Sequence, residues 1–187
     1  MTSGKPATGA PAIHDVVIRR ATPADTDAIL AAHRDSIESL GPASYPADAV
    51  AVWGEGLSRD LYVNAMNGGE VFFIALGEID GHPAVLGFAT HRVDDGVRHA
   101  TAVYIRGSAA RRGIGSALFR HAEADVIASG GGAIEISASL GAVPFYLANG
   151  FQETGRGNIR LRSGKSMACV YMTKTLPSAS GRAHAQS

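Results

Sequence analysis

Apolar residues recur along the chain with two different periods, and the change between them predicts where strands and helices lie. Runs rich in β-branched and aromatic residues, bounded by turn residues, predict strands. The predicted strands cover residues 16–20, 70–78, 84–93, 97–105, 133–137, 158–162 and 167–175. Stretches with apolar residues three and four positions apart predict helices. The predicted helices cover residues 22–40, 47–57, 113–128 and 142–149.

Capping and turn residues support this order of elements. Thr22 followed by Pro23 is typical of a helix start, and Asp80-Gly81 is a turn signal between two strands. The order β-α-α-β-β-β-α-β-α-β-β predicts an α+β fold, with mixed α/β layers around one sheet. We expect a single domain over residues 13–176, a disordered leader over 1–12 and a disordered tail over 177–187.

Composition narrows the function classes. The 17 Lys and Arg residues balance the 17 Asp and Glu residues, so the overall charge does not indicate a nucleic acid or a membrane as partner. No run approaches the roughly 18 apolar residues of a membrane span. Cys169 is the single cysteine, which excludes an internal disulfide framework and fits a reducing cytoplasm. We expect no metal, because four histidines that could be ligands lack metal spacing: His14, His33, His82 and His91.

The stretch RRGIGSALFR, residues 111–120, has the properties of an anion site. It begins a predicted helix, whose free N–H groups and positive dipole end suit a phosphate. Gly113 and Gly115 allow close backbone approach, and Arg111 and Arg112 can add charged hydrogen bonds. Taken alone, the stretch is also compatible with a turn bearing two solvated arginines. It lacks the third glycine of a dinucleotide loop and the Gly-Lys-Ser/Thr of a nucleoside-triphosphate loop.

Two segments carry a resemblance to a known family. AVYIRGSAARRGIGSAL reads as a strand, a loop with Gly-x-Gly and a helix, and IEISASLGAVPFYLANGF follows it with Phe-Tyr and Gly-Phe. Their order and spacing resemble the GNAT acetyltransferase superfamily over nearly the whole chain. The resemblance implies the GNAT fold, a central and largely antiparallel mixed sheet flanked by helices, with acetyl-CoA as co-substrate. Ala110 departs from the family pattern, which usually has Arg or Gln at this position, so that side chain's contribution is absent.

The resemblance also implies where the co-substrate binds. The pyrophosphate would lie on the backbone amides of the loop residues Arg111, Arg112, Gly113, Ile114, Gly115 and Ser116. Val103 and Ile105 would bond the pantetheine arm and the acetyl carbonyl through their backbones, with Tyr104 between them. Ser139 stands where the family often has an Asn that faces the cofactor, and its hydroxyl can still donate a hydrogen bond.

Acetyl transfer to an amine needs a neutral nitrogen and a proton for the departing thiolate. Tyr146 occupies the family's general-acid position, and a phenol with a pKa near 10 is protonated at neutral pH. Phe145, its neighbour, is interpreted as packing. The strand 97–105 has no carboxylate, and His99 is its one group that titrates near neutrality, so His99 is the candidate base. A water chain that removes the proton stays open as the alternative.

The resemblance further implies that the first two helices and their connection wall the acceptor site. Tyr45 and Trp53 are the candidate substrate-binding residues, with Tyr62 near them in sequence, although core packing explains such rings equally well. The partner is an amine acceptor, either a small molecule or a protein amino group, and a homodimer stays open.

We therefore predict a cytoplasmic N-acetyltransferase that acts by direct attack in a ternary complex. The alternatives are a degenerate GNAT domain that binds acyl-CoA as a sensor or scaffold, and an unrelated anion-binding module. Ala110 and Ser139 favour the sensor, whereas Tyr146 favours the enzyme.

Overall fold

The computed structural model describes residues 16–94 and 98–177. The predicted leader, and the predicted tail after Pro177, lie outside the described residues. The stretch Asp94-Asp95-Gly96, a turn signal between two predicted strands, lies outside them as well, apart from the backbone of Asp94.

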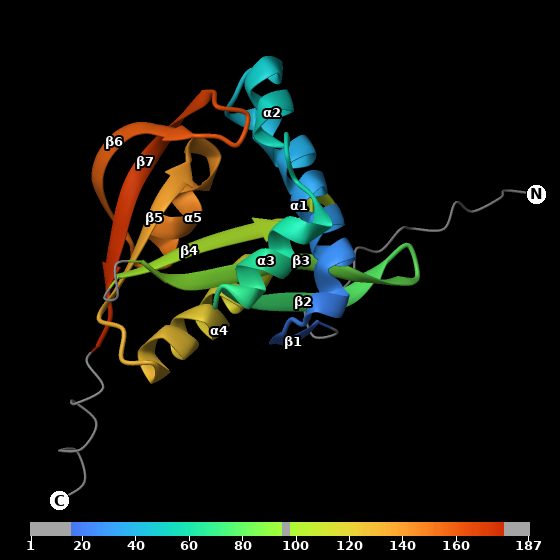
Figure 1. The fold of residues 1–187 in the computed structure, drawn as a ribbon, viewed down its shortest axis with the longest axis horizontal. Helices are drawn as coiled ribbons and strands as arrows, with labels where there is room; N and C mark the ends of the chain where they lie inside the picture. The colour runs from blue at the N-terminus through green and yellow to red at the C-terminus, as the bar shows by residue number, and fades with distance from the viewer. Residues whose placement is uncertain (1–15, 95–97, 178–187) are drawn as a thin grey trace, which may run out of the picture.

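In the described residues, seven strands form one sheet in the order β1-β2-β3-β4-β5-β7-β6 (Figure 1). The strands are β1 (Val17–Arg20), β2 (Val71–Ile79), β3 (His82–Asp94), β4 (Arg98–Ile105), β5 (Ala133–Ser139), β6 (Gln152–Arg160) and β7 (Ser166–Thr175). All neighbours pair antiparallel except β4 and β5, which are parallel. The predicted mixed, largely antiparallel sheet is therefore confirmed.

Helices cover both faces of this sheet. One face carries α1 (Thr26–Leu40), α2 (Ala47–Trp53) and α3 (Arg59–Asn67), and the other carries α4 (Ile114–Ala128) and α5 (Val143–Ala148). Ile29 of α1 packs with Phe72 and Phe88 in one core cluster. Leu118 of α4 packs with Ala89 in a cluster on the opposite face. The predicted layered α+β architecture is confirmed.

The predicted cap Thr22 begins a 3-10 turn that leads into α1, and α1 itself begins at Thr26 with Asp25 as its N-cap. Asp25 accepts the backbone N–H of Thr22 at 2.8 Å and both terminal nitrogens of Arg19, at 2.7 and 2.9 Å. The bonds from Arg19 are the main reason that the pKa of Asp25 falls to about 2. This short 3-10 turn covers Pro23–Asp25, with Pro23 in its first turn, where a missing N–H costs no helical hydrogen bond.

Three element predictions need correction. The second predicted helix ends at Trp53 rather than at residue 57, because Gly54 and Gly56 follow it and Gly56 has a φ of +74°. The sequence analysis missed α3, although Ser58 precedes it in an extended N-cap conformation. Strand β6 begins at Gln152, well before the predicted residue 158, and contains two glycines.

The most important feature of the sheet is the divergence of β4 and β5. These strands pair only at His99 with Ile134 and at Ala100 with Glu135. Figure 1 shows β2 to β4 running across the view, whereas β5 to β7 turn upward. The second half of β4 consequently faces no strand on this side in the described residues.

Candidate functional site

Two residues of β4 point their backbone N–H and C=O groups into the gap that opens where β4 and β5 diverge. In an antiparallel ladder, residues that bond to the neighbour alternate with residues whose N–H and C=O groups point away from it. Arg106 donates its N–H to Leu86 of β3 at 2.9 Å, so Tyr104 also bonds to β3. Val103 and Ile105 therefore direct their backbone groups toward the side from which β5 has departed. These are the two residues that the sequence analysis predicted to bind pantetheine through their backbones.

Tyr146 meets β4 at this point. Its side chain is 2% exposed, and its ring packs edge-on against Phe145 and Phe151 at centroid distances of 5.0 and 5.1 Å. Burial raises the pKa of Tyr146 above its usual value of 10, Tyr104 adds to this, and a hydrogen bond from the backbone of Val103 opposes it. The phenol is thus protonated at neutral pH, with its oxygen beside the diverging backbone of β4.

The loop before α4 has the geometry of an anion cradle. Gly113 is the N-cap of α4 with a φ of +77°, and Arg111 is left-handed with a φ of +60°. The first bond of the helix runs from Ala117 N–H to Gly113 C=O, so Ile114, Gly115 and Ser116 keep N–H groups without a helical partner. Left-handed residues next to a helix start turn successive N–H groups to one concave surface. Arg111 is exposed and Arg112 is partly buried.

Helix α5 is docked against the first turn of α4, which links the loop to Tyr146. A Cβ at Gly115 would lie 3.1 Å from Cε2 of Phe145, so glycine permits this close packing. The side-chain amide of Asn149 donates to Oγ of Ser116 at 3.2 Å and to the carbonyl of Phe145 at 2.8 Å. The interpretation of Phe145 as packing agrees with these contacts.

His99 lies at the closed end of the divergence. A Cβ at Gly131 would be 2.7 Å from the imidazole of His99, and the ring of His91 is 5.7 Å away between centroids. His91 in turn contacts Oδ2 of Asp125 through Nε2 at 2.8 Å. Burial, and then the charge of His91, lowers the pKa of His99. Its Nδ1 is buried without a partner in the described part of the chain. The structure thus brings His99 together with His91 and Asp125, while Tyr146 meets β4 further along, at Val103.

The remaining predicted residues lie on the opposite face of the sheet. Tyr104 turns its ring toward α1, and its backbone bonds to β3, so it offers no backbone group to the divergence. The ring of Trp53 is 6.5 Å from that of Tyr104, and Tyr45 is 5.7 Å from Trp53. Ser139 ends β5, where it pairs with Cys169 of β7.

Tyr45 has a second role that its sequence context did not indicate. Its hydroxyl accepts the N–H of Leu140 at 2.8 Å and donates to the carbonyl of Ala168 at 2.7 Å. The hydroxyl is therefore used both as a donor and as an acceptor. Tyr45 in this way connects the segment between α1 and α2 to the end of β5 and to β7.

Sequence reasoning missed two residues beside this aromatic surface. The ring of His33 on α1 lies tilted against that of Tyr104 with a centroid distance of 3.8 Å, and its Nδ1 is 3.0 Å from the Tyr62 hydroxyl. Burial, and then the charge of Arg162, lowers the pKa of His33 to about 3. The apolar helical period around His33 could have indicated its burial. Arg162 follows β6 in a hairpin, where no pattern points to a site.

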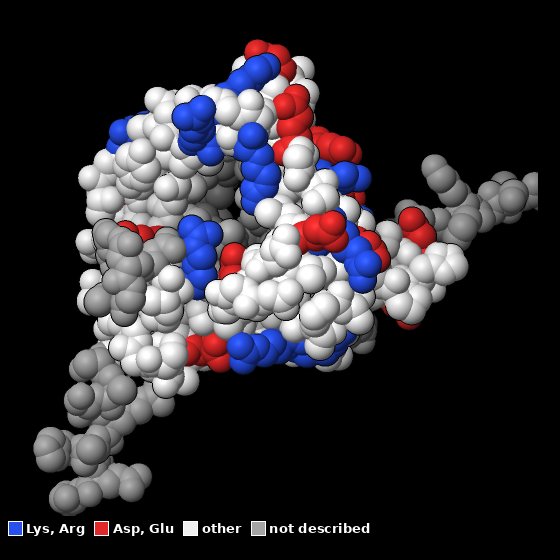
Figure 2. Space-filling model, viewed as in Figure 1, with Lys and Arg blue, Asp and Glu red and all other residues white. Residues whose placement is uncertain are grey.

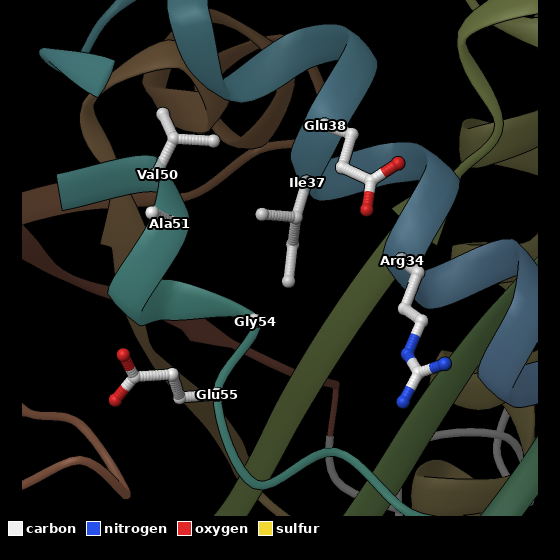
Figure 3. A pocket seen from close by; sticks show the side chains of 7 residues that line it. All are labelled: Arg34, Ile37, Glu38, Val50, Ala51, Gly54 and Glu55. Carbon is white, nitrogen blue, oxygen red and sulfur yellow. The ribbon is translucent and has the colours of Figure 1, made fainter. Parts of the chain in front are cut away.

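The surface is hollowed in two places. Figure 2 shows a hollow between the β6–β7 hairpin and α2 on one side and β4 and α3 on the other, with basic side chains at its rim. A separate cleft of about 220 Å³ lies between α1 and α2 (Figure 3). It is lined by Arg34, Ile37, Glu38, Val50, Ala51, Gly54 and Glu55. None of these was a predicted site residue.

The described residues contain neither a metal-binding cluster nor a membrane-spanning helix. They contain no cluster of three or more His, Cys, Asp or Glu side chains arranged to hold a metal ion. None of their helices is both long and apolar enough to cross a membrane.

Comparisons with known proteins agree with this geometry. A family model described as an acetyltransferase (GNAT) domain matches residues 42–176. A crystal structure of a GCN5-related N-acetyltransferase from Rhodopseudomonas palustris is 24% identical, covers 86% of this chain and 95% of its own, and has a TM-score of 0.72. A ribosomal-protein-alanine N-acetyltransferase from Brucella melitensis is 22% identical, with coverages of 86% and 99% and a TM-score of 0.64.

A phosphinothricin acetyltransferase from Sinorhizobium meliloti, solved in complex with AcCoA, is 20% identical. It covers 87% of this chain and 89% of its own, with a TM-score of 0.66. No curated protein gives a significant match. The structural likenesses show a shared fold, and the family model covers well over half of the sequence. The chain therefore belongs to the GNAT acetyltransferase family.

Proposed function

We propose that this protein is an N-acetyltransferase that moves the acetyl group of acetyl-CoA to an amine acceptor by direct attack in a ternary complex. One observation carries the proposal: the buried hydroxyl of Tyr146 meets the backbone of Val103 where β4 leaves β5. A protonated phenol at the only interior gap of the described sheet is suited to protonating a leaving group there. The balanced charge and single cysteine support a cytoplasmic protein.

The residues present fit acetyl-CoA. Val103 and Ile105 offer backbone donors and acceptors along the divergence, as an extended pantetheine arm requires. The left-handed residues Arg111 and Gly113 and the free N–H groups of the first turn of α4 suit the pyrophosphate. Bound there, acetyl-CoA supplies an activated acetyl thioester. Ala110 contributes no side-chain bond, and Arg111 compensates for it in this proposal.

The protein's own residues act as the general acid and the general base of the transfer. The neutral amine attacks the acetyl carbon, and Tyr146, whose hydroxyl accepts the backbone N–H of Val103, donates its proton to the departing sulfur. His99 is the proposed base. Its lowered pKa keeps His99 neutral near pH 7. Because His99 lies at the closed end of the divergence, we propose that a water molecule carries the proton from the amine to it.

The acceptor is proposed to enter from the face covered by α1, α2 and α3. Tyr45 and Trp53 supply aromatic edges on this face. The hydroxyl of Tyr45 is already committed to Leu140 and Ala168, so only its ring is offered to an acceptor. Ser139 lies at the open end of the divergence and is retained as a weak contact to the co-substrate.

The test combines binding and turnover. Calorimetry should show acetyl-CoA binding, and the melting temperature should rise with ligand because only the native state binds it. Thiol release from acetyl-CoA should then exceed the rate of uncatalysed hydrolysis with at least one amine of a broad panel. No heat of binding at millimolar CoA would overturn the proposal. Tight binding without turnover on any amine would replace it with the acyl-CoA sensor, which Ala110 favours.

A further inference from the structure

Arg162 connects the β6–β7 hairpin to the helices across the aromatic surface. A Cβ at Gly56, in the segment between α2 and α3, would lie 3.4 Å from both Cβ and Cδ of Arg162. The arginine stem therefore crosses from the C-terminal strands to the helical layer. Arg162 is itself exposed, but its charge adds to the lowering of the pKa of His33 by burial and opposes the rise that burial causes in the pKa of Tyr62 and Tyr104, so it lies close enough to act on this cluster.

This guanidinium has no anionic partner within residues 16–94 and 98–177. No carboxylate of those residues lies within ion-pair distance of it. Arg34, the other cation that acts on Tyr62, donates to the carbonyl of Leu57 at 3.0 Å. Glu70 is the one acidic group that acts on Tyr104. Arg162 is thus an exposed positive charge with no carboxylate partner among the described residues.

The aromatic rings near Arg162 strengthen the attraction of its charge for an anion. Trp53 and Tyr104 are partly buried with ring centroids 6.5 Å apart, and Tyr104 stacks on the buried Phe88 at 5.3 Å. A cation beside such rings is screened less by water than one in solution, so its attraction to an anion is stronger. A single planar guanidinium matches a carboxylate with two parallel hydrogen bonds.

We propose that the acceptor of this enzyme is a small amine that carries a carboxylate, an amino acid, whose carboxylate is bound by Arg162 while its side chain lies on the aromatic surface of Tyr104 and Trp53. This inference rests on the proposed function, because it assigns the acceptor of the same transfer. It also explains why the hairpin arginine reaches as far as Gly56. The carboxylate anchors one end of the acceptor, and the amine is left to face the divergence where Tyr146 lies.

The experiment compares acceptors that differ only in the carboxylate. Thiol release is measured with the twenty standard amino acids, β-alanine and γ-aminobutyrate, and with matched pairs such as phenylalanine and phenethylamine. Phenylalaninamide is included because its amine is less basic than that of phenylalanine, so any preference for phenylalanine cannot come from amine ionisation. For the best amino acid, kcat/KM should exceed that of its decarboxylated partner by about 10- to 100-fold, the usual weight of a charged hydrogen bond.

Variants then assign the preference to one side chain. Arg162→Gln should lower kcat/KM for the amino acid by about 10- to 100-fold and leave the decarboxylated amine unchanged, while Arg162→Lys should retain part of the preference. Arg160→Gln is the matched control, because Arg160 is exposed on the same hairpin with its guanidinium beside Gly164. It should leave both rates unchanged.

The outcomes separate this inference from the proposed function. Equal or faster turnover of the decarboxylated amines, or an unchanged preference in Arg162→Gln, would overturn the inference and leave the acetyltransferase intact. Turnover of other amines with none of the amino acids would do the same. Absence of acetyl-CoA binding would instead overturn the function itself, and with it the acceptor.

Discussion

The hydroxyl of Tyr45 accepts the backbone N–H of Leu140 at 2.8 Å, and this bond joins the segment between α1 and α2 to the end of β5. The same oxygen donates to Ala168 of β7 at 2.7 Å. One side chain thus holds together the two parts of the molecule that separate at the divergence. Between the described residues of β4 and β5, the two halves of the sheet pair directly at His99 with Ile134 and at Ala100 with Glu135.

Tyr45→Phe should lower the free energy of unfolding by about 1–3 kcal/mol, because it removes two part-buried hydrogen bonds, to Leu140 and Ala168. Urea unfolding measures the change. Tyr171→Phe is the control, since its exposed hydroxyl makes one long bond of 3.3 Å to Asn158, and its loss should be within about 0.5 kcal/mol. Equal effects of both variants would contradict the bridging role of Tyr45.

Tyr146→Phe should leave CoA affinity near that of the wild type while kcat falls by about 10²–10⁴, the usual weight of general acid catalysis. The ring is buried between Phe145 and Phe151, so the variant keeps its packing and loses one oxygen. The loss should fall on kcat more than on KM, because the bond matters only as charge develops on sulfur. Steady-state thiol release with calorimetry checks this, and wild-type turnover in the variant would assign Tyr146 to packing.

Arg111→Gly should weaken CoA binding about tenfold without loss of stability. Arg111 is held at a φ of +60°, a conformation that costs an L-residue about 1–2 kcal/mol and glycine almost nothing. In Arg111→Gly, relief of that strain offsets the greater conformational entropy of glycine in the unfolded chain. The melting temperature should therefore stay within a few degrees of the wild-type value. Arg120→Ala, on the exposed face of α4, removes the same charge and should leave CoA affinity unchanged. A marked drop in melting temperature in Arg111→Gly would instead give Arg111 a structural role.

His33→Gln should make the protein less sensitive to acid. The pKa of His33 is about 3 in the folded state and near 6.5 when unfolded, so below pH 6.5 the unfolded chain takes up a proton that the native state refuses. This stability is fully present above pH 6.5 and is lost progressively as the pH falls toward 3. Between pH 7 and 5 the wild type should lose about 2 kcal/mol more than the variant. Urea unfolding at both pH values tests this, and His121→Gln, at an exposed position, should match the wild type.

His99→Gln should flatten the acidic limb of kcat/KM if His99 is the base. Its pKa lies below 6.5 through burial and the charge of His91, so the wild-type rate should fall only below that pH. Besides His91 on β3, the charged neighbour is Asp125 on α4, bonded to His91. His91→Gln removes the opposing charge and should move the limb to higher pH. An acidic limb that is unchanged in both variants would mean that water, rather than His99, takes the proton of the amine.

Local patterns were sufficient for most of the elements and for the conformation of the loop before α4. The glycines and arginines of residues 111–116 predicted a helix start with an anion cradle, because left-handed turns and free N–H groups depend on adjacent residues. Alternation along β4 could also have separated Val103 from Tyr104, which lie on opposite faces. Helix α3 was missed although Leu61, Tyr62, Ala65 and Met66 have helical spacing, since a single longer helix had been extended to residue 57.

Long-range contacts account for what the sequence could not predict. Tyr146 reaches Val103 because α5 docks on Gly115, a contact between residues far apart in the chain. Arg162 reaches the aromatic cluster because the β6–β7 register directs its hairpin toward Gly56. The position of His99 beside His91 depends on the pairing of β3 with β4. None of these relationships has a local signature.

The divergence of β4 and β5 gives the sheet an edge inside the molecule. Exposed sheet edges template aggregation, and proteins protect them with charges, bulges or coverings. Here the peptide groups of Val103 and Ile105 are kept between helical layers on both faces, where a thin ligand can reach them and a neighbouring chain's strand cannot. These groups belong to the main chain, so substitutions of either side chain that preserve the strand leave them in place. Sequence drift can therefore remodel the surroundings of this edge without removing its donors and acceptors.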